Sequence, residues 1–135
     1  MRREATVIRL RDIMTTEVLT TSAERPVVEA TTMMVKTRVG SAVVMQGAWL
    51  AGILTERDVL RAAASGSDLT RSPVSEWMTR DPVTATSDTT TTEAAELMLS
   101  NGFRHLPVVE GRTLKGMVSI RDVLASGIRR RPIPE

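Results

Sequence analysis

Cysteine is absent from this 135-residue sequence, and histidine occurs once, at His105. Without thiols the chain can form no disulfide, iron–sulfur cluster or thiolate zinc site, and one imidazole excludes a histidine-rich metal site. Aromatic residues are scarce as well, with only Trp49, Trp77 and Phe103. The core must therefore be built from aliphatic side chains, with eight methionines as flexible filling.

Long hydrophobic runs and a large excess of one charge are also missing. No apolar stretch approaches the roughly 18 residues of a membrane-spanning helix, and the charged amino terminus lacks the apolar segment of a secretory signal. The net charge of +2 gives no broad basic surface for nucleic acids. We therefore predict a cytoplasmic protein with no membrane partner. Residues 129–135, which are rich in arginine, are expected to form a disordered tail.

The sequence repeats itself. Shifting the chain by 64 positions aligns its halves without a gap and gives 14 identities over the 50 positions from Arg11 to Leu60, where chance would supply roughly three. Gly52 falls on Gly116, for example, and 57–60 falls on 121–124. We expect repeats at 8–64 and 72–128, packed on each other because a unit of about 55 residues buries too little apolar surface alone.

Each repeat has the pattern of an α/β unit with the element order β-α-β-β-α. Short β-prone stretches at 18–21 and 83–86 precede helical segments, and pairs of strands follow them. Residues at helical spacing predict the inward faces of the first helices: Val27, Ala30 and Met34, and in the second repeat Ala94, Leu97 and Met98. Pro26 suits the opening turn of one helix, Ser87 or Asp88 can cap the other, and Gly102 is typical of its end.

The two strands of each pair are short and end at a glycine turn. They are expected at 42–45 and 50–54, joined around Gly47, and at 106–109 and 114–118, joined around Gly111. A last helix begins at Thr55 or Ser119, both good N-caps. It is expected to direct these side chains inward: Val59 and Leu60, or Val123 and Leu124.

The segment 52–58, repeated at 116–122, is the candidate binding site. In each copy a hydroxyl residue at a helix start, Thr55 or Ser119, precedes an aspartate by three residues, Asp58 or Asp122. A helix N-terminus suits an anion, and an aspartate can accept two hydrogen bonds from a sugar diol. The hydroxyl can instead only cap the helix. The same spacing, found twice, favours binding.

Taken together, these features resemble the CBS-domain family (the cystathionine-β-synthase repeat), whose members occur as tandem pairs. The resemblance covers about residues 10–126 and rests on these segments: Asp12–Thr15, Glu76–Thr79, Phe103–Val109 and both Gly-x-x-Thr/Ser-x-x-Asp motifs. It implies an α/β fold of the two-layer α+β kind, in which two β-α-β-β-α repeats pack with pseudo-twofold symmetry. It also implies a regulatory module that is not an enzyme, a homodimer, and a protein client that the sequence does not identify.

The resemblance further implies an adenosine ligand in the cleft between the repeats and no other required cofactor. AMP, ADP or ATP is expected first, with S-adenosylmethionine, NAD(H) or cyclic di-adenylate as alternatives. Asp58 and Asp122 would hold ribose hydroxyls, and Thr55 and Ser119 sugar or phosphate oxygens. The other implied contacts are backbone near Leu19, Thr20, Val83 and Thr84 for adenine, Arg104 and His105 for phosphate in the Asp58 site, and Pro107.

The copies differ where Arg104 and His105 align with Gly40 and Ser41, which predicts two unequal sites. A catalytic triad of His105, Ser119 and Asp122 is disfavoured because nothing prepares an oxyanion hole. Trp49 and Trp77 are expected to pack, or an exposed Trp49 to mark a dimer contact. Two other functions stay open: a structural interaction module with vestigial sites, and nucleic-acid binding through the arginines at the two ends.

Overall fold

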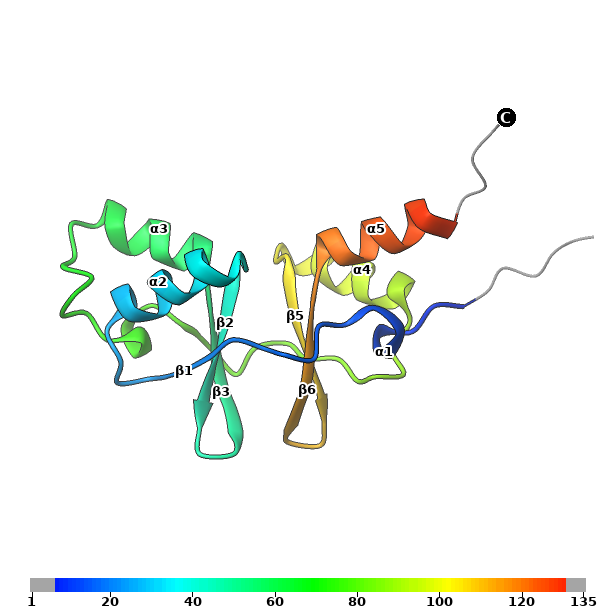
Figure 1. Cartoon of the computed structure of the whole chain (residues 1–135), viewed down its shortest axis with the longest axis horizontal. Coiled ribbons are helices and arrows are strands. Elements are labelled where there is room, and N and C mark those ends of the chain that lie inside the picture. Colours follow the sequence, from blue (N-terminus) through cyan, green and yellow to red (C-terminus); the bar gives the residue numbers. More distant parts are fainter. Residues whose placement is uncertain (1–6, 131–135) are drawn as a thin grey trace, which may run out of the picture. The chain divides into compact units, whose positions relative to one another are not determined.

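The computed structural model describes residues 7–130 (Figure 1). In chain order the elements are α1 (Leu10–Ile13), β1 (Thr20–Ser22), α2 (Val27–Thr37), β2 (Ser41–Gln46), β3 (Trp49–Thr55), α3 (Glu56–Ala64), the 3-10 turn η1 (Val74–Glu76), β4 (Thr79–Arg80), α4 (Thr91–Asn101), β5 (His105–Glu110), β6 (Thr113–Ser119) and α5 (Ile120–Arg130). This mixed α/β arrangement confirms the fold class. No helix in the described range is long and apolar enough to cross a membrane.

The chain forms two compact units that cut across the sequence repeat. Unit 1 combines residues 7–16 with 84–110 and 115–130, and unit 2 combines 17–83 with 111–114. The opening segment of each repeat therefore lies in the unit built mainly from the other repeat. α1 lies with α4 and α5, whereas η1 and the segment after it lie with α2 and α3.

Unit 2 contains a four-stranded sheet in the order β1-β2-β3-β4. β1 runs parallel to β2, β2 and β3 form an antiparallel hairpin, and β4 pairs antiparallel with β3 opposite Gly52. Helices α2 and α3 lie together beside this hairpin (Figure 1). The core of the unit is formed by these buried residues: Val27, Ala30, Val44, Leu54 and Val74.

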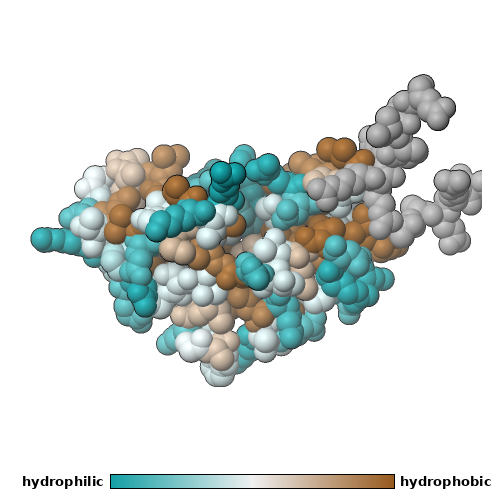
Figure 2. Space-filling view, in the orientation of Figure 1, coloured by the Kyte–Doolittle hydropathy of each residue, from teal (hydrophilic) through white to brown (hydrophobic). Residues whose placement is uncertain are grey.

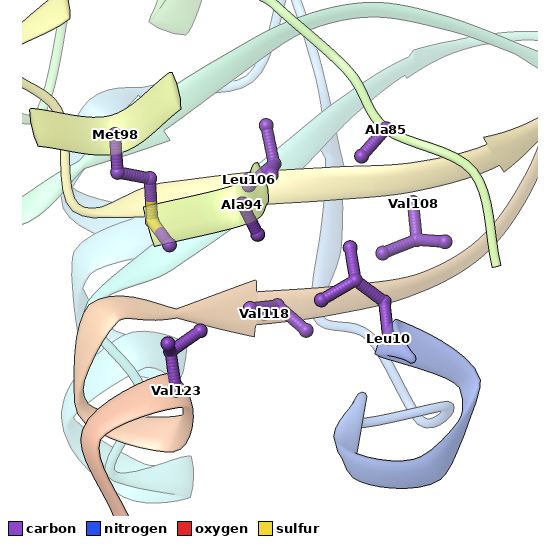
Figure 3. Close-up of a cluster of buried hydrophobic side chains, with 8 residues drawn as sticks. All are labelled: Leu10, Ala85, Ala94, Met98, Leu106, Val108, Val118 and Val123. Carbon is purple, nitrogen blue, oxygen red and sulfur yellow. The ribbon is translucent and has the colours of Figure 1, made fainter. Parts of the chain in front are cut away.

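Unit 1 is built around the β5-β6 hairpin. Figure 3 shows its core, to which α1, α4, both strands and α5 each contribute: Leu10, Ala85, Ala94, Met98, Leu106, Val108, Val118 and Val123. Two isolated bridges extend the hairpin, Thr15 with Met117 and Ala85 with Val108. The predicted first strand of this repeat, 83–86, is thus reduced to a single bridge.

Most helix signals are confirmed. The predicted inward residues Val27, Ala30 and Met34 are all buried on α2, as are Ala94 and Met98 on α4. Gly102 ends α4 in the left-handed conformation, with φ of 75°. Pro26 lies one position before the first residue of α2, as its N-cap.

Two predictions about the helices are wrong. The N-cap of α4 is Thr90 rather than Ser87 or Asp88, because Thr90 and Glu93 form a reciprocal capping box at the true helix start. Leu60 and Leu124 do not point inward and are 71% and 60% exposed. Val59 and Val123 pack against the cores of their units, and each following leucine lies about 100° further round the helix, toward the surface.

The predicted tail is only partly covered by the structure. Its first residues, 129 and 130, belong to α5, which ends at Arg130. Residues 131–135 lie outside the described residues, as do the two arginines near the amino terminus. The prediction of a disordered tail therefore stays untested from residue 131 onward.

Candidate functional site

The first candidate site lies where β3 passes directly into α3. Thr55 is the last residue of β3 and the N-cap of α3. Its backbone N–H and its hydroxyl both donate to Asp58 Oδ2, at 2.9 and 3.0 Å, and the Asp58 N–H donates to Thr55 Oγ1 at 3.3 Å. This capping box holds the Asp58 side chain against the first turn of the helix, where the partial positive charge favours a carboxylate.

The surrounding chain fixes this junction. The Glu56 N–H donates to the Gly40 carbonyl at 3.0 Å, which ties the start of α3 to the loop before β2. On β3 the backbone at Gly52 approaches the opening segment of the second repeat closely. A Cβ at Gly52 would lie 2.6 Å from the Thr79 carbonyl oxygen and 3.0 Å from Met78 Sδ. Only glycine fits there.

Asp58 is buried and has a cationic neighbour. It is 4% exposed, one of the few polar residues in the buried part of the described chain. Its Oδ1 accepts a hydrogen bond from Arg61 Nη1 at 3.0 Å, and the Arg61 guanidinium lies 5.7 Å from the centroid of the Trp77 ring. Arg61 is not among the residues predicted from the sequence, although an arginine three residues after an aspartate on a helix is a recognisable pairing signal.

The second candidate site repeats the same hydrogen bonds in unit 1. The Ser119 N–H and hydroxyl donate to Asp122 Oδ2, each at 2.9 Å, and the Asp122 N–H donates to Ser119 Oγ at 3.2 Å. The Ile120 N–H donates to the Arg104 carbonyl at 2.9 Å, as Glu56 does to Gly40. Asp122 is half-buried, and Ala125 occupies the position that corresponds to Arg61.

The other predicted contacts divide between the units. Leu19, Thr20 and Val83 belong to unit 2 with Thr55 and Asp58. Unit 1 holds the remaining predicted contacts beside Ser119 and Asp122: Thr84, Arg104, His105 and Pro107. Arg104 and His105 are predicted to contact a phosphate bound in the Asp58 site. Because they belong to unit 1 and Asp58 belongs to unit 2, this contact stays a prediction.

The backbone acceptors near the predicted adenine contacts already have partners. The Leu19 carbonyl accepts from the Val43 N–H at 2.9 Å, and the Pro107 carbonyl accepts from the Ala85 N–H at 3.0 Å. Pro107 is buried, whereas Val83 is 42% exposed and Arg104 is exposed. Of the predicted contacts, Thr20, Val83 and Arg104 are exposed and thus the most accessible to a ligand.

The two strand-to-helix junctions, at Thr55–Asp58 and Ser119–Asp122, lack the ligand set of a metal centre within the described residues. Among residues 7–130 no group of three or more histidine, aspartate and glutamate side chains is placed to hold a metal ion. What each junction offers is a hydroxyl and a carboxylate at a helix N-terminus, which is suited to accepting hydrogen bonds from a polar ligand. A separate open groove runs along α4 and includes Thr84, Glu93 and Leu99, but neither aspartate lines it.

Trp49 and Trp77 have different surroundings. Trp77 is half-buried against the core of unit 2, as predicted for a packing residue, and its Nε1 is buried without a hydrogen-bond partner. Trp49 is 56% exposed, and the guanidinium of Arg112 lies 4.3 Å from its ring centroid. Trp49 therefore does not serve the core, and its predicted alternative role as a dimer contact stays open.

Comparison with known proteins identifies the repeat. The family described as "CBS domain" matches residues 10–65 and again 74–128. The chain is 36% identical over 115 residues to the CBS domain-containing protein YhcV of Bacillus subtilis, covering 84% of this chain and 81% of that protein.

Solved structures agree with the sequence match. A protein with CBS domains from Burkholderia ambifaria superimposes with a TM-score of 0.87 at 28% identity, covering 96% of this chain and 98% of the other. A CBS domain protein from Pyrobaculum aerophilum, solved in complex with AMP, gives a TM-score of 0.80 at 28% identity over 90% of this chain and 99% of the other. Both repeats match the family, and the chain therefore belongs to the CBS domain family.

Proposed function

We propose that this chain is a regulatory module that binds an adenine nucleotide at its strand-to-helix junctions. The observation that carries the proposal is the same hydroxyl–carboxylate pair at two helix starts, Thr55 with Asp58 and Ser119 with Asp122. A buried carboxylate such as Asp58 is costly unless it has partners, and a bound sugar diol would supply two more. The similar Pyrobaculum aerophilum protein, which binds AMP, supports an adenosine ligand.

In this proposal the carboxylates bind the ribose and the hydroxyls help to hold sugar or phosphate oxygens. Asp58 and Asp122 accept hydrogen bonds from ribose hydroxyls, while the hydroxyls of Thr55 and Ser119 contact sugar or phosphate oxygens of the ligand. The N-termini of α3 and α5 favour the negative charge of a phosphate. AMP, ADP and ATP are the first candidates, and S-adenosylmethionine, NAD(H) and cyclic di-adenylate are the alternatives.

Regulation requires more than binding. A ligand shifts an equilibrium only if it binds one conformation or assembly better than another. We infer that the nucleotide favours one state of the module and that a protein client responds to this state.

Isothermal titration calorimetry against AMP, ATP, NADH, S-adenosylmethionine and cyclic di-adenylate tests the proposal. Wild-type protein, freed of ligand by unfolding and refolding, should bind at least one of them. The double variant Asp58→Ala/Asp122→Ala should lose that binding. Glu93→Ala is the matched control, since it also removes the carboxylate of a capping box and should bind as the wild type does. Absence of binding by the wild type would contradict the proposal and turn attention to a structural interaction module.

We also propose a homodimer, for which the helices of each unit provide apolar surface. Corresponding positions are exposed in both repeats: Val35 and Leu99, at 73% and 75%, and Leu60 and Leu124, at 71% and 60%. Figure 2 shows hydrophobic residues at the surface over the α2–α3 pair and, separately, over the α4–α5 pair. Exposed apolar side chains that gather in this way are typical of interaction surfaces.

Sedimentation velocity tests the dimer. Leu60→Glu combined with Leu124→Glu should shift the protein from dimer to monomer, because charge is then buried without a partner. Lys115→Glu, an exposed charge reversal on β6 rather than on the helices, is a control that should leave the dimer intact. A wild-type protein that sediments as a monomer at all concentrations would contradict the proposal.

A further inference from the structure

Arg61 makes two contacts in unit 2 that have no counterpart at the Ser119–Asp122 junction. Its Nη1 donates to Asp58 Oδ1 at 3.0 Å, and its guanidinium lies 5.7 Å from the centroid of the Trp77 ring. The corresponding position on α5 is Ala125, whose side chain can make neither contact. The asymmetry lies at the carboxylate that is proposed to bind the ribose.

With Arg61 in place, both oxygens of the Asp58 carboxylate are engaged. Oδ2 accepts two hydrogen bonds from Thr55, and Oδ1 accepts the one from Arg61. The Asp58 side chain is only 6% exposed. A carboxylate has about four acceptor positions, and Thr55 and Arg61 fill three of them. A sugar diol that donates two hydrogen bonds must therefore displace one partner, and Arg61 at Oδ1 is the exposed one.

The two partners of Arg61 are fixed, whereas Arg61 itself can move. Asp58 is held by the capping box, and Trp77 packs against the buried core of unit 2. The Arg61 side chain is 61% exposed, so it can turn into solvent without disturbing the core. An exposed guanidinium also loses little when it leaves one partner, because water replaces the hydrogen bond.

We propose that Arg61 is a latch on the Asp58 site. It occupies the carboxylate while the site is empty and leaves both Asp58 and Trp77 when the ribose of a nucleotide binds. The latch lowers the affinity of the Asp58 site below what its carboxylate would otherwise give, and the Asp122 site has no such restraint. This inference rests on the proposed function, because it assumes that Asp58 binds the ligand.

The test uses Trp77 as a reporter of the latch. In a Trp49→Phe background, Trp77 is the only tryptophan. AMP is titrated into this parent and into its Arg61→Ala and Arg57→Ala derivatives, and both calorimetry and tryptophan emission are recorded. Arg57 is the matched control, being an exposed arginine on the same helix with no partner among the described residues.

The latch predicts that AMP changes the Trp77 emission of the parent and that this change disappears in the Arg61→Ala derivative. Arg61→Ala should bind AMP about fivefold more tightly, the factor expected for the loss of a competing ion pair whose arginine is exposed. Arg57→Ala should behave as the parent does in both measurements.

The outcomes separate the latch from the proposed site. Unchanged AMP affinity in Arg61→Ala would overturn the latch and leave the nucleotide site standing. Weaker binding would also overturn it and would make Arg61 a direct ligand contact. If the parent and both derivatives bind no AMP, and the wild type binds none of the other adenosine ligands, the proposed function fails and the latch fails with it.

Discussion

The helix starts at Thr55 and Ser119 have the same hydrogen bonds and different surroundings. In both, an N–H and a hydroxyl donate to one aspartate oxygen at 2.9–3.0 Å. Asp58, however, is buried and paired with Arg61, whereas Asp122 is half-buried beside a position occupied by alanine. The capping box provides hydrogen-bond partners for backbone N–H groups at the start of both helices. Its presence alone therefore does not show whether each aspartate has a structural role or a binding role. The surroundings of each aspartate must do so.

A second pair of equivalent positions differs in its backbone chemistry. Arg38 is the C-cap of α2 and Gly102 the C-cap of α4, and both residues adopt the left-handed conformation, with φ of 58° and 75°. Glycine enters this region freely, whereas arginine is strained there. Both repeats therefore have a left-handed residue after the helix, although the first repeat has arginine there instead of the glycine that suits this conformation.

The largest expected effect concerns the two glycines on which the opening segments pack. A Cβ at Gly116 would lie 2.8 Å from both the Thr15 carbonyl oxygen and Met14 Sδ, which resembles the crowding at Gly52. We expect Gly52→Ala and Gly116→Ala each to lower the free energy of unfolding by about 2 kcal/mol, because the backbone must shift to admit a methyl group. Urea denaturation measures this change.

Gly127→Ala is the control for these glycines, since a Cβ there meets nothing within 4 Å. It should raise the free energy of unfolding by about 0.5 kcal/mol, because Gly127 lies inside α5 and alanine favours a helix. If Gly52→Ala proved as stable as the wild type, the close packing of the opening segment on β3 would be refuted.

An intermediate effect is expected from exchanging the helix ends. Arg38→Gly should raise the free energy of unfolding by about 1 kcal/mol, because it relieves the left-handed strain at the end of α2. Gly102→Arg should lower it by a similar amount at the end of α4. Thermal and urea unfolding of both variants provide the measurement, and equal stability of all three proteins would contradict this interpretation.

The smallest effect is a pH dependence from the capping box of α4. Hydrogen bonds from the Thr90 hydroxyl and backbone lower the pKa of Glu93 below its ordinary value of 4.5. The folded state therefore favours the ionised carboxylate, so this contribution to stability is present above pH 4.5 and is lost as the pH falls through the lowered pKa.

Glu93→Gln tests this dependence because glutamine can form the same box without ionising. The melting temperatures of wild type and Glu93→Gln are compared between neutral pH and pH 3. The wild type should lose slightly more stability than the variant on acidification. Parallel melting curves at every pH would contradict the assignment.

The sequence allows much of the local structure to be predicted, since local spacing determines it. The helical spacing of Val27, Ala30 and Met34 predicted their burial, and Thr55 and Ser119 were correctly predicted as N-caps. The N-cap at Thr90 could also have been found, because Thr90 and Glu93 have the spacing of a capping box.

Other features depend on contacts between residues far apart in the chain. The packing of Met14 on Gly116 and of Met78 on Gly52 places each opening segment in the unit of the other repeat, and no local pattern reveals this exchange. Leu60 and Leu124 were misjudged because hydrophobicity alone does not decide which helix face is inward. In α3 the buried positions include Asp58 and Ala62 instead.

The most direct test of the central claim compares Asp58→Asn with Asp122→Asn in AMP binding by calorimetry. Asparagine preserves the size of the side chain and much of the cap, but it offers one acceptor oxygen where the carboxylate has two. We predict that Asp58→Asn weakens AMP binding by about tenfold or more, as expected for losing a hydrogen bond to a charged group, and that Asp122→Asn has the smaller effect. AMP affinity that is unchanged in both variants would contradict the account.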